Sequence, residues 1–168
     1  MPAVSAYRVI FVCMGNICRS PMAELVFRHQ LAREQMADLV IVDSAGTGDW
    51  HAGDPADRRA RSALERRGYP SGHQAKQFRS DWFTQRDLVV ALDRDNVRDL
   101  RRLAPTKSAA DAIRLLREFD SAAEAVDVPD PYYGDAAGFD EVLTQIETSC
   151  AGLLQHLRNE VAAPRQPA

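Results

Sequence analysis

Residues 7–21 read YRVIFVCMGNICRSP, and this stretch decides the fold. Its first part, residues 7–12, is apolar and β-prone, which is typical of a buried parallel strand. Ser20 and Pro21 are typical of a helix start, because serine offers a capping hydroxyl and proline suits the first helical position. Residues 13–20 are therefore predicted to join the carboxyl end of a strand to the start of a helix.

A loop at such a junction is a typical anion-binding site, because backbone N–H groups converge there and the helix dipole favours negative charge. Cys13 stands where the strand meets the loop, and helix N-termini and nearby cations favour a thiolate. Arg19 can bind two oxygens of a tetrahedral anion with its planar guanidinium. A thiolate facing an arginine-bound phosphate is positioned for in-line attack on phosphorus. The alternative is a buried, inert Cys13 and a surface Arg19.

The remaining loop residues suit an anion-binding turn. Gly15 lets the chain turn without steric cost. The amide of Asn16 can tie the loop's own backbone together, and the hydroxyl of Ser20 can donate to the sulfur. The residues predicted to surround the anion are Met14, Gly15, Asn16, Ile17 and Cys18.

The rest of the chain alternates apolar strand patterns with helical ones. Further strands are predicted over residues 39–44, 87–92 and 113–116, and helices are predicted from Ser20, Asp54, Asp95 or Asn96, and Gly138. Strands joined by crossover helices imply a parallel sheet, since such connections are right-handed in nearly every case. We therefore expect an α/β fold: a single three-layer domain with a four-stranded parallel sheet flanked by helices, spanning residues 1–168. Its core covers about 7–160, and 161–168 form a frayed tail.

Composition narrows the class of protein. A net charge of -3 and a pI near 5.8 argue against general nucleic-acid or membrane binding. No apolar run approaches the ~18 residues of a membrane span, and the first residues do not resemble a secretory signal. Three cysteines cannot build a full disulfide framework, which favours a reducing compartment. We expect a cytoplasmic, bacterial protein and leave signal-independent export open.

The histidines and cysteines show no metal-ligand spacing, so neither a metal nor another cofactor is expected. Cys150 falls on the apolar stripe of the last helix, which indicates core packing. Cys18 is close enough to Cys13 in the chain for a reversible disulfide, and a small packed thiol is the alternative. The helix after Asp54 carries a basic face, either solvated or substrate-binding.

A second chemical element lies in residues 129–134, which read PDPYYG. Attack by Cys13 expels an alkoxide or phenoxide, which needs a proton. A carboxylic acid above the pocket can supply it, typically accelerating the reaction ~10²–10⁴-fold. Pro131 restricts Asp130 to extended backbone, which would aim its carboxyl group. The alternative is an ordinary Asp-Pro turn at the surface.

The C-x5-R-S-P pattern of residues 13–21, with DSAGT at 43–47 and DPYY at 130–133, resembles the low-molecular-weight protein tyrosine phosphatase family, most closely its actinobacterial members. The likeness spans positions 9 to about 157. It implies hydrolysis of phosphotyrosine and aryl phosphates through a cysteinyl-phosphate intermediate. In that reaction Cys13 is the nucleophile, Arg19 binds phosphate and stabilises the transition state, and Asp130 is general acid and then general base.

The resemblance also implies supporting residues. Trp50 and Tyr132 would flank a slot deep enough to select phosphotyrosine, while Tyr133 packs nearby. A hydrogen-bond network would hold the loop, formed by Asn16, Ser20, Ser44 and His73. Asp93 would orient the loop that carries Asp130 or a neighbouring loop. Each of these residues has a structural alternative as a turn, surface or packing residue.

The implied partners are phosphotyrosine proteins, with no nucleic acid and no membrane insertion, and a monomer is expected. In some bacterial relatives the paired tyrosines are phosphorylated, which implies a tyrosine kinase acting on Tyr132 or Tyr133. Two other functions were weighed. An arsenate reductase on the same loop would need further redox cysteines after the third strand, and this chain has none there. A silent phosphoprotein-binding module would be expected to lack Cys13, Arg19 or Asp130.

Overall fold

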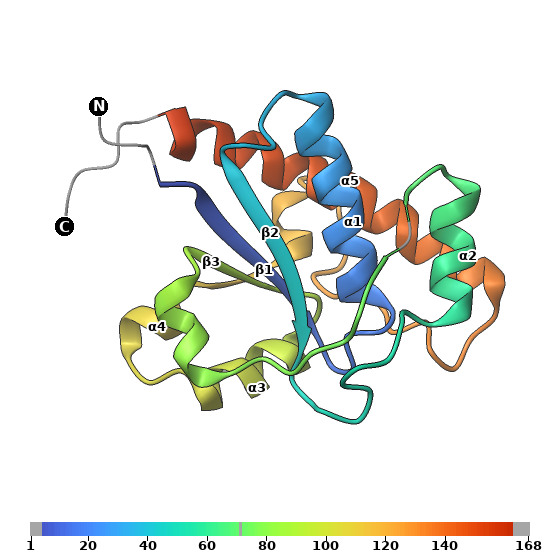
Figure 1. Cartoon of the computed structure of the whole chain (residues 1–168), viewed down its shortest axis with the longest axis horizontal. Coiled ribbons are helices and arrows are strands. Elements are labelled where there is room, and N and C mark those ends of the chain that lie inside the picture. The colour runs from blue at the N-terminus through green and yellow to red at the C-terminus, as the bar shows by residue number, and fades with distance from the viewer. Residues whose placement is uncertain (1–4, 71, 163–168) are drawn as a thin grey trace.

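The computed structural model describes residues 5–70 and 72–162, which form a parallel sheet covered by helices on both faces (Figure 1). The strand order is β2-β1-β3-β4. The strands are β1 (Tyr7–Cys13), β2 (Val40–Gly46), β3 (Leu88–Ala91) and β4 (Ile113–Leu115). The predicted α/β fold with a four-stranded parallel sheet is thus confirmed.

Seven helical segments accompany the strands in the part of the chain that the structure describes. They are α1 (Arg19–Arg33), α2 (Arg58–Arg66), α3 (Arg94–Leu103), α4 (Lys107–Asp111), α5 (Ala136–Ala162), and the 3-10 segments η1 (Ser80–Gln85) and η2 (Leu116–Phe119). Figure 1 shows α1, α2 and α5 on one face of the sheet and α3 and α4 on the other.

The central strand β1 explains these layers, because its side chains alternate between the two faces. Val9 and Phe11 join the core beneath α1, α2 and α5. Ile10 and Val12 join the smaller core with η1 and α3. All four are fully buried. A strand covered on both faces reads as a continuous apolar run, as the sequence does here.

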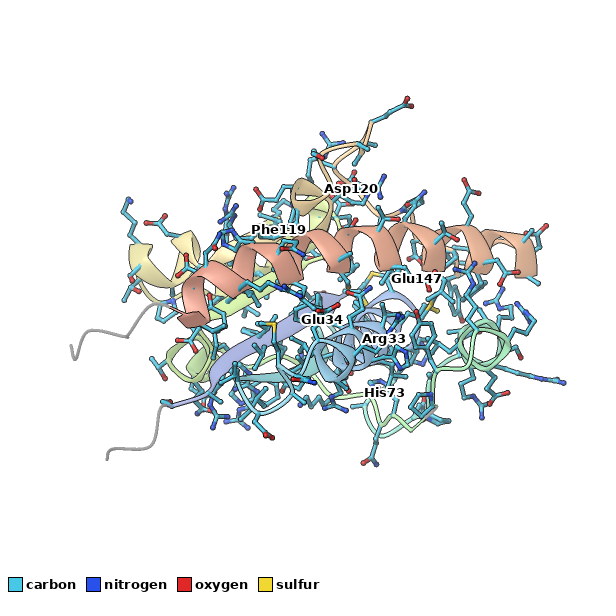
Figure 2. The ribbon with its side chains drawn as sticks, turned by 90° about the horizontal axis from the view of Figure 1, so that it is seen from above. Arg33, Glu34, His73, Phe119, Asp120 and Glu147 are labelled. Atoms are coloured by element: carbon cyan, nitrogen blue, oxygen red, sulfur yellow. The ribbon has the colours of Figure 1, made fainter. Side chains whose placement is uncertain are left out.

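The long helix α5 lies lengthwise across its face of the sheet (Figure 2). It packs on α1 on one side and on η2 on the other. Gly152 permits the second contact, since a Cβ atom there would lie 1.9 Å from the carbonyl oxygen of Phe119. Cys150 is fully buried in the same core, as predicted. The predicted frayed tail is wrong for Val161, which belongs to α5, and residues 163–168 lie outside the described part.

The carboxyl ends of the strands meet at one edge of the sheet, which places the loop of residues 13–20 there. Cys13 ends β1 and pairs with Gly46, the last residue of β2. A Cβ atom on Gly46 would lie 2.7 Å from the carbonyl oxygen of Met14, so only glycine lets the loop pass this close. Ser44, the last residue of the predicted second strand, lies inside β2 opposite Phe11, because β2 continues to Gly46.

Four helix starts differ from the prediction, and the first two are those of α1 and α2. Helix α1 begins at Arg19, and its Cys18 cap makes no side-chain hydrogen bond, so Ser20 is not the cap. Helix α2 is capped by Asp57 and not Asp54. The contacts of the side chains explain both differences: the hydroxyl of Ser20 contacts Cys13, and the carboxylate of Asp57 accepts a hydrogen bond from the amide of Arg59 in the first turn of α2.

The other two helix starts that differ from the prediction are those of α3 and α5. Asp93 caps α3 by accepting a 2.7 Å hydrogen bond from the amide of Asn96, in place of the predicted Asp95 or Asn96. Helix α5 begins at Ala136, two residues before the predicted Gly138.

Candidate active site

The sulfur of Cys13 lies at the end of β1, in contact with the first turn of α1. Its Sγ atom is 2.9 Å from Ser20 Oγ, and both residues are buried. Ser20 Oγ already accepts a 2.8 Å hydrogen bond from Asn16 Nδ2. Its own proton is therefore available for the sulfur, or for the carbonyl of Ala45 at 3.3 Å. A serine at this position can stabilise a thiolate.

Asn16 holds the loop from inside. It is fully buried, with φ at 56°, a left-handed conformation that asparagine tolerates better than most residues. Its Nδ2 also donates to Ser44 Oγ (2.9 Å), and its Oδ1 accepts from the amide of Lys76 (3.0 Å). His73 Nε2 lies 2.7 Å from the backbone oxygen of Asn16 and must donate to it. The structure thus brings the expected network of Asn16, Ser20, Ser44 and His73 together.

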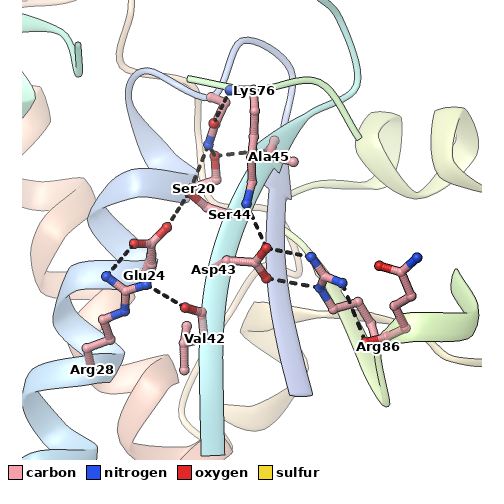
Figure 3. A network of polar contacts seen from close by, with 11 residues as sticks. Ser20, Glu24, Arg28, Val42, Asp43, Ser44, Ala45, Lys76 and Arg86 are labelled. Carbon is pink, nitrogen blue, oxygen red and sulfur yellow. Dashed lines mark hydrogen bonds and ion pairs between the residues drawn. The ribbon is translucent and has the colours of Figure 1, made fainter. Parts of the chain in front are cut away.

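This network continues into α1, where sequence analysis missed two residues (Figure 3). Ser44 Oγ donates to Glu24 Oε1 at 2.8 Å, and Glu24 Oε2 pairs with Arg28 Nη1 at 2.9 Å. Arg28 also donates to the carbonyl of Val42 at 2.7 Å. One signal in the sequence could have indicated this network. A glutamate stands inside the apolar stretch of α1, and a carboxylate is buried in such a place only when it is paired.

A second ion cluster supports the loop from outside. Asp43 accepts from Lys76 Nζ at 2.7 Å and from Arg86 Nη2 at 2.6 Å (Figure 3). Both cations lie 5.3 Å from the ring centre of Trp82. Because the amide of Lys76 binds Asn16, this cluster fixes the segment that passes beneath the loop.

Arg19 is almost fully buried and is held in one orientation. Its Nη1 donates to Asp93 Oδ2 at 2.6 Å and to the carbonyl of Val128 at 2.9 Å. Its Nη2 lies 3.7 Å from Asp130 Oδ2. Burial opposes the charge, but Cys13, Asp93 and Asp130 outweigh it and raise the pKa of Arg19. Asp93 was predicted to orient the acid loop or a neighbouring loop; its side chain instead positions Arg19 and caps α3.

Residues 129–134, here called the acid loop, cover the pocket near Arg19. The carboxylate of Asp130 accepts from the amide of Tyr132 at 3.1 Å, a local turn that aims it. Its side chain is about one-third exposed, at 34%. Tyr133 was predicted to pack but is 91% exposed, and its ring lies edge to face with that of Tyr132, with the ring centres 5.0 Å apart.

These elements enclose a cavity of about 360 Å³. It is lined by Cys13, Met14, Gly15, Ile17, Cys18, Arg19, Trp50, His51, Asp130, Tyr132 and Tyr133. Asn16, Ser20, Ser44, His73 and Asp93 lie behind this lining. Of the five loop residues predicted to surround the anion, all but Asn16 line the cavity, and so do the two predicted aromatic residues, Trp50 and Tyr132. The residues predicted to support the site contact the loop and Arg19 from outside the cavity.

His51 is a lining residue to which sequence analysis gave no role. Its ring lies against the loop of residues 13–20, because a Cβ atom on Gly15 would be 3.2 Å from His51 Cδ2. His51 Nδ1 is 3.3 Å from Asp54 Oδ2, which ties the ring to the segment before α2.

Cys18 is a buried free thiol beside Cys13. Burial raises the pKa of its thiol strongly, and Asp57, Cys13 and Asp130 raise it further. Cys18 is therefore a neutral, packed side chain in this state. Its disulfide with Cys13 stays a prediction.

The basic face of α2 is used for packing and for holding the acid loop. Arg66 pairs with Asp140 of α5 at 2.9 Å, and Arg67 pairs with Glu147, which Figure 2 shows on the same helix. Arg59 donates to the backbone of the acid loop, at Tyr132 and Gly134. Sequence analysis offered a solvated or a substrate-binding face, and missed these contacts.

Within residues 5–70 and 72–162, no group of three or more histidine, cysteine, aspartate or glutamate side chains is placed to hold a metal ion. None of the helices described there has the length and apolar character needed to cross a membrane.

Comparison with known proteins agrees with the resemblance. The family model "Low molecular weight phosphotyrosine protein phosphatase" matches residues 8–163. A low molecular weight protein-tyrosine-phosphatase from Streptomyces coelicolor is 52% identical over 92% of this chain and 96% of its own length. Low molecular weight protein-tyrosine phosphatase A from Mycobacterium bovis is 50% identical, covering 86% of this chain and 88% of its own.

Solved structures give the same result. The crystal structure of a protein tyrosine phosphatase from Entamoeba histolytica matches with a TM-score of 0.89 and 34% identity, covering 92% of this chain and 99% of that one. The chain therefore belongs to the low-molecular-weight protein-tyrosine phosphatase family. It is accordingly an enzyme of the phosphoric monoester hydrolase class.

Proposed function

We propose that this enzyme hydrolyses phosphotyrosine in proteins, and simple aryl phosphates, through a cysteinyl-phosphate formed on Cys13. One observation carries the proposal: the thiol of Cys13, the guanidinium of Arg19 and the carboxyl of Asp130 line the same cavity at the carboxyl end of β1. Together they supply a nucleophile, an anion-binding group and a proton donor.

In the first step, Cys13 Sγ attacks phosphorus as the bond to the tyrosine oxygen breaks. Arg19 binds two non-bridging oxygens with its free N–H groups, since Nη1 is occupied by Asp93 and Val128. Asp130 donates its proton to the departing phenolate. In the second step, Asp130 takes a proton from water, the water oxygen attacks phosphorus, and the sulfur leaves as a thiolate stabilised by Ser20. The products are tyrosine and inorganic phosphate.

The binding of the phosphoryl group depends on backbone N–H groups of residues 14–19, at the N-terminal end of α1. The buried network around Asn16 supports this role, because it fixes the loop before any ligand arrives. Preorganised donors of this kind do not need to reorient as charge moves in the transition state.

The preference for phosphotyrosine depends on the aromatic side chains at the cavity. Trp50 and Tyr132 both line it, and each can contact a phenyl ring through its face. Tyr133, 91% exposed, is accessible to a tyrosine kinase, and Tyr132 is partly so. A monomeric, cytoplasmic protein remains a prediction.

An arsenate reductase is the runner-up with the same loop. That chemistry exports a disulfide through further cysteines, and the chain has only Cys150 besides the two in the loop. Cys150 is fully buried in the core between α1 and α5. The geometry therefore favours phosphate ester hydrolysis.

The test is hydrolysis of p-nitrophenyl phosphate, a phosphotyrosine peptide and a phosphoserine peptide, with EDTA present, by wild type and Cys13→Ser. We expect EDTA-resistant activity on the two aryl substrates only, abolished in the variant while phosphate still binds. Turnover by Cys13→Ser would remove the nucleophile assignment. An inactive wild type under reducing conditions would favour a binding module, and arsenate with a thiol donor would then be assayed.

A further inference from the structure

We propose that Arg59 is a positioning residue for the reaction: it holds the backbone on which the carboxyl of Asp130 is aimed. This inference rests on the proposed function, in which Asp130 is the general acid. Arg59 belongs to the first turn of α2 and comes from a part of the chain about 70 residues away from the acid loop.

The central observation is that both backbone polar groups of Tyr132 are engaged. Its carbonyl accepts from Arg59 Nη2 at 2.8 Å, and its amide donates to Asp130 Oδ1 at 3.1 Å. Arg59 Nη1 also donates to the carbonyl of Gly134 at 3.0 Å. One guanidinium therefore holds the loop at two points, and a shift of Tyr132 away from it would carry the carboxyl of Asp130 with it.

The acid loop depends on an outside donor because of its own sequence. Pro129 and Pro131 have no backbone N–H, so the loop can form few hydrogen bonds with itself. Its carbonyl groups still need donors. An arginine offers five N–H groups in a fixed plane, enough to bind two carbonyls and a carboxylate together.

Arg59 is itself fixed by its surroundings. Its Nε and Nη2 each lie 3.1 Å from an oxygen of Asp57, and its guanidinium lies 4.6 Å from the ring centre of Phe139. Burial would raise the pKa of Asp57, but its hydrogen bonds with Arg59 outweigh burial and lower it. An ionised Asp57 keeps the arginine paired.

The same aspartate touches the phosphate-binding loop. The amide of Asp57 donates to the carbonyl of Ile17 at 2.8 Å. The start of α2 therefore contacts the anion site through Asp57 and the acid loop through Arg59. It sets the distance between the two parts of the site that the reaction must bring together.

The main test is Arg59→Met, which removes every donor but keeps an apolar stem over Phe139. The readout is kcat/KM for a series of aryl phosphates with different leaving groups. We expect a ~10–100-fold loss for phenyl phosphate, a poor leaving group, and less than about a threefold loss for p-nitrophenyl phosphate, because only poor leaving groups need an aimed proton. Arg59→Lys should recover part of the loss, since one ammonium can reach one carbonyl.

Arg66→Met is the matched control. Arg66 also lies on α2 and pairs across to α5, at Asp140, and within the described residues it forms no hydrogen bond or ion pair with the acid loop. Its leaving-group dependence should equal that of wild type. Equal losses on all substrates in Arg59→Met would indicate a merely structural role and overturn the inference.

A double variant separates positioning from general damage. In an Asp130→Ala background, Arg59→Met should lower kcat/KM by less than about a further twofold, because the carboxyl group that Arg59 positions is already absent. Losses that multiply would overturn the inference. If Asp130→Ala alone leaves the leaving-group dependence unchanged, the proposed acid role has failed, whatever Arg59 does. Should Arg59→Met not fold, Arg59→Lys carries the test, with a loss confined to poor leaving groups expected and an equal loss contradicting it.

Discussion

The phosphate-binding loop and the acid loop lie on the same cavity but are built in opposite ways. The first is held by buried hydrogen bonds that converge on Asn16, which has no exposed surface. The second projects to the surface, carries Tyr133, which is 91% exposed, and is held from elsewhere in the chain by Arg59, which donates to the carbonyls of Tyr132 and Gly134. The loop of residues 13–20, which is the proposed anion site, is therefore fixed by folding, whereas Asp130, the proposed proton donor, is attached to it by a few identifiable bonds.

This difference separates stability from catalysis. Breaking a buried polar network costs free energy, because the groups left behind lose a hydrogen-bond partner and cannot replace it with water. A change in the phosphate-binding loop should thus reduce both stability and activity. A change in the acid loop should reduce activity alone. The variants below test this separation, from the largest expected effect to the smallest.

Asp130→Ala should give the largest change that leaves the fold intact. We expect kcat/KM for phenyl phosphate to fall ~10²–10⁴-fold, with a smaller fall for p-nitrophenyl phosphate. The melting temperature should stay near that of wild type, because the carboxyl is about one-third exposed. Steady-state kinetics and a thermal melt measure both. A large loss of stability would show that the acid loop supports the fold and would break the comparison.

Asn16→Ala should affect both properties. It removes the donor that the hydroxyls of Ser20 and Ser44 share and the acceptor of the Lys76 amide, so the free energy of unfolding should fall by about 2–4 kcal/mol. We expect kcat/KM to fall ~10-fold or more as the loop loses its shape. Urea titration and kinetics test this.

Asn96→Ala is the control for that variant. Asn96 is also a buried asparagine, but its Oδ1 has no hydrogen-bond partner within the described residues. Asn96→Ala should therefore reduce the free energy of unfolding and kcat/KM less than Asn16→Ala does. Equal effects of the two variants would contradict the special role given to the network.

Glu24→Gln should sharpen the comparison at the outer end of the network. The change keeps the shape of the side chain but removes its charge pairing with Arg28, which is 52% exposed and therefore screened. We expect a loss of about 1 kcal/mol or less in the free energy of unfolding, and activity within about threefold of wild type. A tenfold loss of activity would show that the charge reaches the reacting centre.

The smallest expected effect is the pH dependence due to His73. Burial lowers the pKa of His73 below its ordinary value near 6.5. Between that ordinary value and the lower folded one, the unfolded chain binds more protons than the folded one. The free energy of unfolding should therefore fall as pH drops below 6.5, by at most about 1.4 kcal/mol per pH unit. His73→Gln should flatten this part of the profile; an unchanged slope would exclude His73 as its source.

The fold, and the position of Cys13 and Arg19 at the candidate site, could be predicted from the sequence because their signals are local. The apolar run before Cys13, the glycine within the loop and the serine and proline after it all lie within 15 residues. The order of strands and helices then placed the loop at the carboxyl edge of the sheet. These inferences need only the neighbours of each residue along the chain.

What escaped prediction depends on contacts between distant segments. The use of Glu24 depends on Ser44, 20 residues away, and that of Arg59 on Tyr132, 73 residues away. Ser20 looked like a helix cap because local propensity favours that role, but the sulfur of Cys13 competes for its hydroxyl. The exposure of Tyr133 likewise follows from how the acid loop leaves the core.

The bonds of Arg19 to Asp93 and Val128 also bear on what happens after the reaction. With its orientation fixed during folding, the guanidinium in its proposed role should bind any tetrahedral dianion at little further entropic cost, including one no longer attached to a tyrosine. Free phosphate should then compete with the substrate. At the end of each turnover, the product phosphate must dissociate from the same guanidinium. The rate of this enzyme should therefore fall as the phosphate concentration around it rises, a dependence that follows from two hydrogen bonds of Arg19.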